Sequence, residues 1–173
     1  YIALVKANPR VWTGPNVPSP GETEEEINIL AETLPAAAIA TMRRQLETRK
    51  AAGNPPNALF ELHCRNLKKI HDAGMVIGLG TDGTGDGFGA HQQIAYYTRC
   101  GFTSSEAIQA ATSVNARILG LTRFGTVSTG KQADFVVLDA NPLDNISNTR
   151  RINKVYIRGS ELDRAALRTN FLK

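Results

Sequence analysis

A single carboxylate, Asp82, stands where an apolar segment meets a run of glycines, and this junction is the strongest candidate for chemistry in the chain. The apolar segment, residues 75–79, is rich in β-branched and aliphatic side chains and predicts a short buried strand. Gly78 and Gly80 lie in and just after it, which indicates close approach of backbone or a ligand. Because a charge directly after a buried strand is costly without a partner, Asp82 is expected to meet a metal ion, a basic substrate or backbone amides.

Three neighbours of this carboxylate are candidates for substrate binding. Thr81 and Gly83 flank Asp82, and His91 lies nine residues further on, at or just before a predicted helix. Structural roles compete with each of these. Asp82 could cap the following turn, and His91 could begin the helix or pack against it. Thr81 could have a structural hydroxyl, because no histidine is spaced to act as its base.

The remaining histidines and the two cysteines do not form a recognisable metal site. His63 and His71 are eight residues apart on a predicted helix, whereas a metal pair on one helix face is usually about four apart. Cys64 and Cys100 form no CxxC motif, so we expect neither a disulfide framework nor a cysteine zinc site. Both cysteines are interpreted as small buried hydrophobic residues.

The composition is that of a globular chain without a strong charge bias. Of 173 residues, 42% are hydrophobic and 21% are charged, and 20 basic against 16 acidic residues give a formal charge of +4. No segment approaches the roughly 20 apolar residues that span a bilayer, so no membrane contact is expected. Small basic groups without interleaved aromatics indicate solvated surfaces and no nucleic-acid binding; they are Arg43, Arg44, Arg49, Lys50, Lys68, Lys69, Arg150 and Arg151. The compartment is left open, with the cytoplasm slightly favoured.

The segments around Asp82 predict helices that alternate with strands. Thr23 with Glu26 three residues later matches a capping box and predicts a helix start. Apolar periodicity predicts further helices over 36–52, 57–72, 90–100, 106–114 and 115–119. In the 57–72 helix the apolar side is expected to carry Leu59, Leu62, Leu67 and Ile70, and the 106–114 helix is expected to be capped by Ser104 or Ser105.

Two further features complete the predicted organisation. The 57–72 helix, a tight turn and the 75–79 strand follow one another, which is the order of a parallel α/β unit, and residues 11–13 are a separate short strand candidate. The last third changes to a small β part, with strands over 133–139 and 153–159 and a join near 120–125. Asp134, in the turn that enters the first of these strands, is interpreted as structural.

Several motifs together resemble the C-terminal part of the amidohydrolase superfamily, in its imidazolonepropionase-like and prolidase-like branch. The matching pieces keep their order and spacing from about residue 55 to 160, and they are residues 73–83, 100–112, 116–121, 125–138, 141–143 and 154–159. The resemblance implies an α/β fold: the C-terminal portion of a (β/α)8 metal-dependent hydrolase barrel plus part of a small β-sandwich. The implied division is 1–122 for the last barrel strands and helices, 123–160 for the sandwich part and 161–173 for a tail or helix.

The resemblance also implies an activity and a role for Asp82. In that family the acid that ends the eighth barrel strand is a metal ligand and a proton carrier, and here that acid is Asp82. A divalent metal, with zinc favoured, lowers the pKa of bound water from about 15.7 toward about 7, and a carboxylate beside it can pass that proton to a leaving amine. The implied reaction is hydrolysis of a C–N bond in a small amide, cyclic amide or dipeptide.

In the resembling family the other metal ligands are a His-x-His pair, a bridging Lys or Glu and two further histidines from earlier strands, and none has a matching position in this sequence. We therefore interpret the chain, which opens at Tyr1 without a methionine, as a C-terminal fragment that is inactive alone and binds no metal by itself. Its expected partner is the missing N-terminal part of the barrel or another copy of the chain. Two alternatives are an NAD-type dinucleotide-binding domain, since 78–83 formally matches GxGxxG, and a non-catalytic assembly piece with exposed sheet edges.

Overall fold

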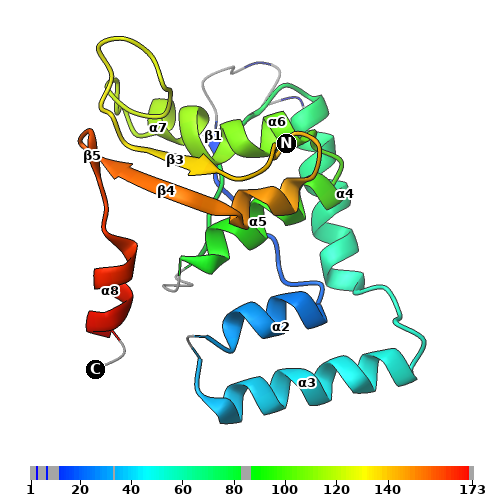
Figure 1. Ribbon diagram of the computed structural model, residues 1–173. Helices are drawn as coiled ribbons and strands as arrows, with labels where there is room; N and C mark the ends of the chain where they lie inside the picture. The colour runs from blue at the N-terminus through cyan, green and yellow to red at the C-terminus, as the bar shows by residue number, and fades with distance from the viewer. Residues whose placement is uncertain (1–2, 4–6, 8–11, 33, 83–86, 172–173) are drawn as a thin grey trace.

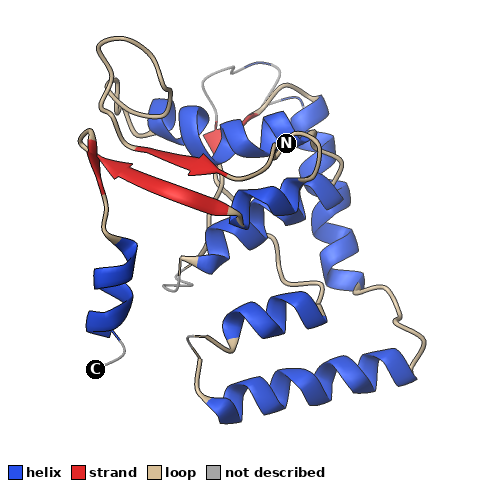
Figure 2. Ribbon diagram, in the orientation of Figure 1, coloured by secondary structure: helices blue, strands red, loops and turns tan. Residues whose placement is uncertain are grey.

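The structure is a computed structural model that describes residues 3, 7, 12–32, 34–82 and 87–171. Helices surround a short two-stranded sheet, and a three-stranded sheet lies across one side of them (Figure 1). Figure 2 shows that helices dominate the fold, which is mixed α/β as predicted. In chain order the elements are β1 (Trp12–Thr13), α2 (Glu24–Leu30), α3 (Ala36–Ala51), α4 (Ala58–Asp72), β2 (Val76–Ile77), α5 (Phe88–Arg99), α6 (Ser104–Gln109), the π-helical turn η1 (Ala110–Val114), α7 (Asn115–Ile118), β3 (Phe135–Leu138), the 3-10 turn η2 (Ile146–Arg150), β4 (Ile152–Ile157), β5 (Ser160–Glu161) and α8 (Arg164–Phe171).

The two central strands run parallel, as the α/β pattern predicted. Trp12 lies opposite Val76 and Thr13 lies opposite Ile77. The main core packs around this sheet and includes Tyr97, which has no exposed surface. Burial raises the pKa of Tyr97, so its hydroxyl keeps its proton.

Helices α2 and α3 form a hairpin below the rest of the molecule in the view of Figure 1. Thr23 is the N-cap of α2, and Glu26 completes the predicted capping box. The hairpin has its own apolar cluster, formed by Ile27, Leu30, Ile39 and Leu46. Phe88, the first residue of α5, packs against this cluster and so connects the hairpin to the segment that follows Asp82.

Helix α4 buries only part of the apolar side that the sequence predicted: Leu67 is buried and Ile70 packs against the core, as expected. Phe60, Cys64 and Leu67 are buried, whereas Leu59 is 55% exposed and Leu62 is 42% exposed. The buried residues are spaced four and three apart and form one stripe along the helix. The helix therefore carries two apolar stripes, and only one of them faces the core of this chain.

Cys64 and Cys100 form a disulfide, so the expectation of two unpaired cysteines was wrong. Both residues are buried, as predicted. They are 36 residues apart in sequence, and their Cα atoms come within 4.4 Å because α4 packs beside the end of α5. The bridge closes a loop that contains β2 and Asp82.

One helical stretch runs from α6 through η1 to α7 without a break. Its cap is Thr103, which forms a capping box with Glu106, and not Ser104 or Ser105 as predicted. The middle of the stretch, η1, is a π-helical turn, a rare local widening that is frequent at functional sites. Asn115 is the first residue after this turn.

The C-terminal third forms an antiparallel sheet in the order β3–β4–β5. Phe135 stacks on Tyr156 with ring centroids 4.6 Å apart. Asp134 accepts a hydrogen bond from the Arg158 N–H at 2.6 Å, which confirms its structural role. Val136 is 48% exposed on this sheet, and membership of a β-sandwich stays a prediction, as does the division into domains.

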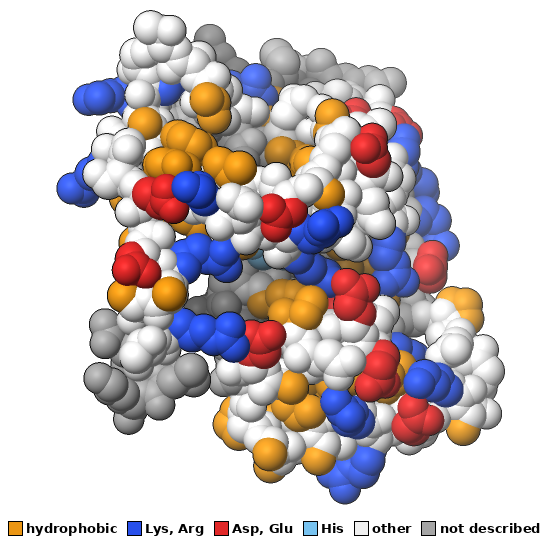
Figure 3. Space-filling view, viewed as in Figure 1, with side chains coloured by type: hydrophobic (Ala, Val, Ile, Leu, Met, Phe, Trp, Pro, Cys, Tyr) orange, Lys and Arg blue, Asp and Glu red, His pale blue; other side chains and the backbone are white. Residues whose placement is uncertain are grey.

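Acidic and basic side chains are interspersed on the face shown in Figure 3 rather than separated into patches of one sign. That the chain binds no nucleic acid stays a prediction from its sequence. Within the ranges that the structure describes, no helix is both long and apolar enough to pass through a bilayer.

Candidate active site

Asp82 lies at the end of the sheet where the two parallel strands lead into their C-terminal loops. Beyond β2, the Gly78 N–H donates to the Thr13 carbonyl at 2.8 Å, and the Gly80 N–H donates to the Pro15 carbonyl at 3.3 Å. The two segments therefore continue side by side past the assigned strands. Two residues later the exposed Asp82 side chain emerges at this end of the sheet.

The backbone of Asp82 is left-handed, with φ of 48°. For an L-residue this conformation costs about 1–2 kcal/mol, and aspartate is one of the few side chains that tolerate it. Residues held in such conformations cluster at functional sites. Asn54 and Arg158 share this conformation, so the position of Asp82 at the end of the sheet, and not its backbone alone, marks it as a candidate.

The glycines before Asp82 allow close approach, as the sequence indicated. A Cβ atom at Gly80 would overlap the Gly14 carbonyl, so the approaching group there is backbone. At Gly78 the approaching group is the Asn115 side chain. The Tyr97 hydroxyl, 2.7 Å from the Gly78 carbonyl and 2.9 Å from the Pro15 carbonyl, ties both segments to α5.

The predicted substrate-binding residues are placed only in part. Thr81 is half-buried next to Asp82, whereas Gly83 lies outside the described residues. His91 is half-buried in the first turns of α5, and its Nδ1 atom is buried without a hydrogen-bond partner among the described residues. Burial, and after it the positive charge of Arg150, lower the pKa of His91, so its ring is mainly neutral at pH 7. The charge that acts on His91 thus comes from Arg150.

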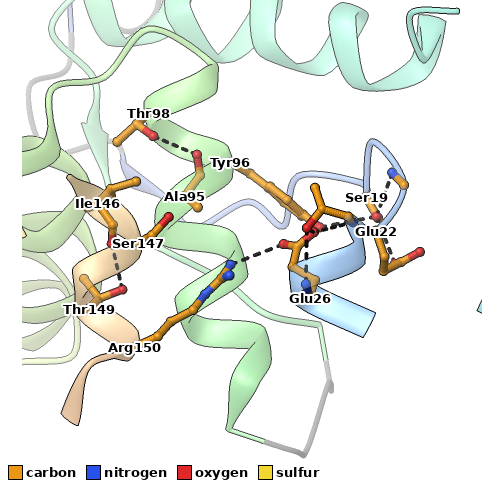
Figure 4. Close-up of polar contacts among 12 residues, drawn as sticks. Ser19, Glu22, Glu26, Ala95, Tyr96, Thr98, Ile146, Ser147, Thr149 and Arg150 are labelled. Carbon is orange, nitrogen blue, oxygen red and sulfur yellow. Dashed lines mark hydrogen bonds and ion pairs between the residues drawn. The ribbon is translucent and has the colours of Figure 1, made fainter. Parts of the chain in front are cut away.

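Arg150 itself is a residue that the sequence placed wrongly, on a solvated basic face. Its side chain is only 13% exposed, and its Nη2 atom lies 3.2 Å from Oε1 of Glu26, whose side chain is 8% exposed. The guanidinium also lies over the Phe88 ring, 4.8 Å from its centroid. Figure 4 shows Arg150 reaching from η2 past α5 to Glu26 on α2. The two partners are 124 residues apart in sequence, and no local pattern marks them as a pair.

A complete metal site is not formed by the residues that the structure describes. None of their His, Cys, Asp and Glu side chains gather in groups of three or more that could hold an ion. Zinc takes four ligands in structural sites and three protein ligands in catalytic ones, so Asp82 with its described neighbours does not fit a metal on its own. The imidazole of His71 lies 3.2 Å from Asp72 and 3.4 Å from Glu106, and the expectation that His63 and His71 bind no metal stays a prediction.

Comparison with known proteins decides the family. Residues 8–162 match the amidohydrolase family. The chain belongs to this family. The imidazolonepropionase of Deinococcus radiodurans is 31% identical over 102 residues, which are 55% of this chain and 26% of that enzyme. The 5-methylthioadenosine/S-adenosylhomocysteine deaminase of Carboxydothermus hydrogenoformans is 34% identical over 98 residues, which are 47% of this chain and 23% of that enzyme.

Two solved enzyme structures are also similar to this chain. Phenylurea hydrolase B superposes with a TM-score of 0.56 at 32% identity, over 65% of this chain and 28% of its own. A Xaa-Pro dipeptidase with bound methionine superposes with a TM-score of 0.55 at 25% identity, over 61% of this chain and 26% of its own. The chain spans about a quarter of the length of the curated relatives that it matches. The predicted family is confirmed, and the fold is consistent with part of a barrel hydrolase.

Proposed function

We propose that this chain contributes Asp82, as metal ligand and proton carrier, to the active site of a hydrolase that cleaves C–N bonds in small amides, cyclic amides or dipeptides. The observation that carries the proposal is the position of this residue. Asp82 is exposed a few residues past β2, just beyond the Gly80–Pro15 hydrogen bond, at the end of the sheet where both parallel strands lead into their loops. Barrel enzymes place catalytic side chains at this end of their strands.

The chemistry of the residues present supports this role. A carboxylate at the mouth of the sheet can take a proton from an attacking water and return it to the leaving nitrogen. His91, nine residues after Asp82, is another proposed substrate contact, although its unpartnered Nδ1 atom is buried in this structure. Thr81 and Gly83, on either side of Asp82, are the other proposed substrate contacts. Relatives that include a deaminase, a phenylurea hydrolase and a dipeptidase support cleavage of C–N bonds.

A divalent metal, with zinc favoured, is the proposed cofactor, and its remaining ligands would come from outside these residues. One carboxylate does not hold a catalytic zinc ion, which takes about three protein ligands. We therefore expect the isolated chain to bind no stoichiometric zinc and to have no hydrolase activity.

The surface beside β1 supports a protein partner that completes the site. A groove of about 500 Å³ lies between residues that follow β1, including Pro15 and Val17, and the α4 residues Leu67 and Ile70. Outside the groove, Trp12 of β1 is 54% exposed, and Leu59 and Leu62 of α4 are 55% and 42% exposed. Apolar surface next to a strand suits a further strand and helix. The proposed partner is the preceding part of the same barrel, with another copy of the chain as the alternative.

The dinucleotide-binding alternative is disfavoured by the helix that follows Asp82. In that motif the glycines open a helix whose N-terminus holds the pyrophosphate. Here α5 begins at Phe88, beyond residues 83–86, and its cap is Gly87. An exposed acid at position 82 would also repel phosphate.

Co-expression with the preceding coding sequence tests the proposal. We expect that sequence to encode a His-x-His pair about two hundred or more residues before Tyr1, the length of the earlier barrel strands. The assembled protein should then bind zinc, measured by elemental analysis, and hydrolyse members of a panel of N-acyl amino acids, dipeptides and cyclic amides. The 173-residue chain alone should do neither. Metal-dependent turnover by the chain alone, or an assembly without zinc and without turnover, would contradict the proposal.

A further inference from the structure

The backbone between β2 and Asp82 is bonded on two sides although the sheet has only two strands among the described residues. On the side of β1, the N–H groups of Gly78 and Gly80 donate to carbonyls of the neighbouring segment. Since successive residues of a strand point their peptide groups to opposite sides, the N–H and C=O of Leu79 point away from β1. An unpaired peptide group at this half-buried position would be costly.

The side chain of Asn115 takes the place of a strand at Leu79. The Leu79 N–H donates to Oδ1 of Asn115 at 3.0 Å, and Nδ2 of Asn115 donates to the Leu79 carbonyl at 2.9 Å. A primary amide has one acceptor and two donors, so it can reproduce the pair of hydrogen bonds that a neighbouring strand would make. This pair joins residues 36 apart in sequence.

Two features of the chain create room for this contact. Gly78 has no side chain, and a Cβ atom there would overlap Oδ1 of Asn115 and lie 2.9 Å from Cδ1 of Ile118. The π-helical turn η1 ends immediately before Asn115, and η1 contacts β2. A π turn inserts an extra residue and rotates the next helical residues about the helix axis. Gly78, the π turn and Asn115 therefore meet at one place in the fold and together allow the contact with Leu79.

We propose that Asn115 is a positioning residue, whose amide clamps the Leu79 peptide and thereby fixes the place and the left-handed backbone of Asp82. The importance of that placement rests on the proposed function of Asp82. Leu79 lies three residues before Asp82, and the left-handed conformation of Asp82 persists only while its neighbours hold it. The Asn115 clamp also links the site to the helical stretch that precedes the small sheet.

NMR of the whole 173-residue chain tests the clamp without any assay of turnover. In Asn115→Ala the Leu79 amide should exchange about tenfold faster, which corresponds to the loss of one to two hydrogen bonds. The Gly78 amide, which is bonded to Thr13, should keep its exchange rate. The three-bond coupling between the amide and α protons of Asp82 should move away from its left-handed value. Gly78→Ala should reproduce both changes at Leu79 and Asp82, because its methyl group displaces the Asn115 amide.

Asn148→Ala is the matched control. It removes another asparagine whose Nδ2 atom bonds a carbonyl, that of Asn141 at 2.8 Å, and should leave Leu79 and Asp82 unchanged. An unchanged Leu79 exchange rate in folded Asn115→Ala would overturn the clamp, and faster exchange with an unchanged Asp82 coupling would overturn the positioning role. If Asn115→Ala does not fold, a nuclear Overhauser effect between the Asn115 amide protons and the Gly78 α protons in the unaltered chain decides, and its absence overturns the proposal. Because none of these readings depends on catalysis, failure of the proposed function is seen separately.

Discussion

Reduction of the Cys64–Cys100 disulfide should remove a large part of the stability of this chain. The bridge joins residues 36 apart. For a loop of that length, the loss of chain entropy in the unfolded state corresponds to about 4 kcal/mol of stabilisation at 25 °C. A domain of this size is typically stable by only about 5–15 kcal/mol. Breaking the bridge should also loosen the loop that contains β2 and Asp82.

Urea unfolding of the oxidised and the reduced chain, followed by circular dichroism, measures this effect. A thiol count on the untreated chain should find no free thiol, and reduction should release two, since Cys64 and Cys100 are the cysteines of the sequence. The double variant Cys64→Ala/Cys100→Ala should be destabilised like the reduced chain and should not respond to reductant. Two free thiols in the untreated folded chain, or the same urea midpoint before and after reduction, would refute the reasoning.

Polar contacts give three further predictions. Glu26→Gln leaves the Arg150 charge buried without its partner and should lower the free energy of unfolding by about 3 kcal/mol. Adding Arg150→Met should recover part of this loss. An unchanged urea midpoint in Glu26→Gln would contradict the prediction. Because the pKa of His91 is lowered in the folded chain, the unfolded chain binds the proton more readily, so stability should fall as the pH drops below about 6.5. His91→Asn should flatten this part of the plot of stability against pH. An equally steep plot in the variant would be evidence against the lowered pKa. Thr103→Ala removes a capping box and should cost about 1 kcal/mol in thermal or urea unfolding, and a neutral result would count against that cap.

The sequence predicted those features that depend on residues close together in the chain. The capping box of Thr23 and Glu26 needs partners only three residues apart, so the start of α2 was predicted and is confirmed. The helices over 36–52 and 57–72 were visible in their apolar period, and they appear as α3 and α4. The apolar segment before Asp82 was recognised as a strand, although the structure assigns only Val76–Ile77.

Contacts between residues far apart in the sequence could not be predicted from such local patterns. The pairing of Cys64 with Cys100 depends on how α4 packs beside the end of α5, and no motif links them. The same holds for Arg150, whose partner Glu26 lies 124 residues away and converts an apparent surface charge into a buried one. Which apolar stripe of α4 faces the core was also undetermined, because the helix has two.

In the candidate site too, local features were predicted from the sequence and long-range contacts were not. The position of Asp82 followed from a strand that ends in glycines, a pattern contained within a few residues. The left-handed backbone of Asp82 and the Asn115 amide that supports its segment are products of tertiary packing. A signal for the second was present in Gly78, whose missing side chain indicated an approaching group without identifying it.

The most direct test of the central claim is the kcat/KM of the proposed assembled hydrolase with Asp82→Asn. Asparagine has nearly the same shape and tolerates the left-handed backbone, so folding and assembly should be preserved while the proton carrier is lost. We predict a fall in kcat/KM of about a thousandfold, and an unchanged value for Asp144→Asn, which removes an exposed carboxylate from the turn before η2. Full activity of Asp82→Asn would contradict the assignment of this carboxylate to the active site.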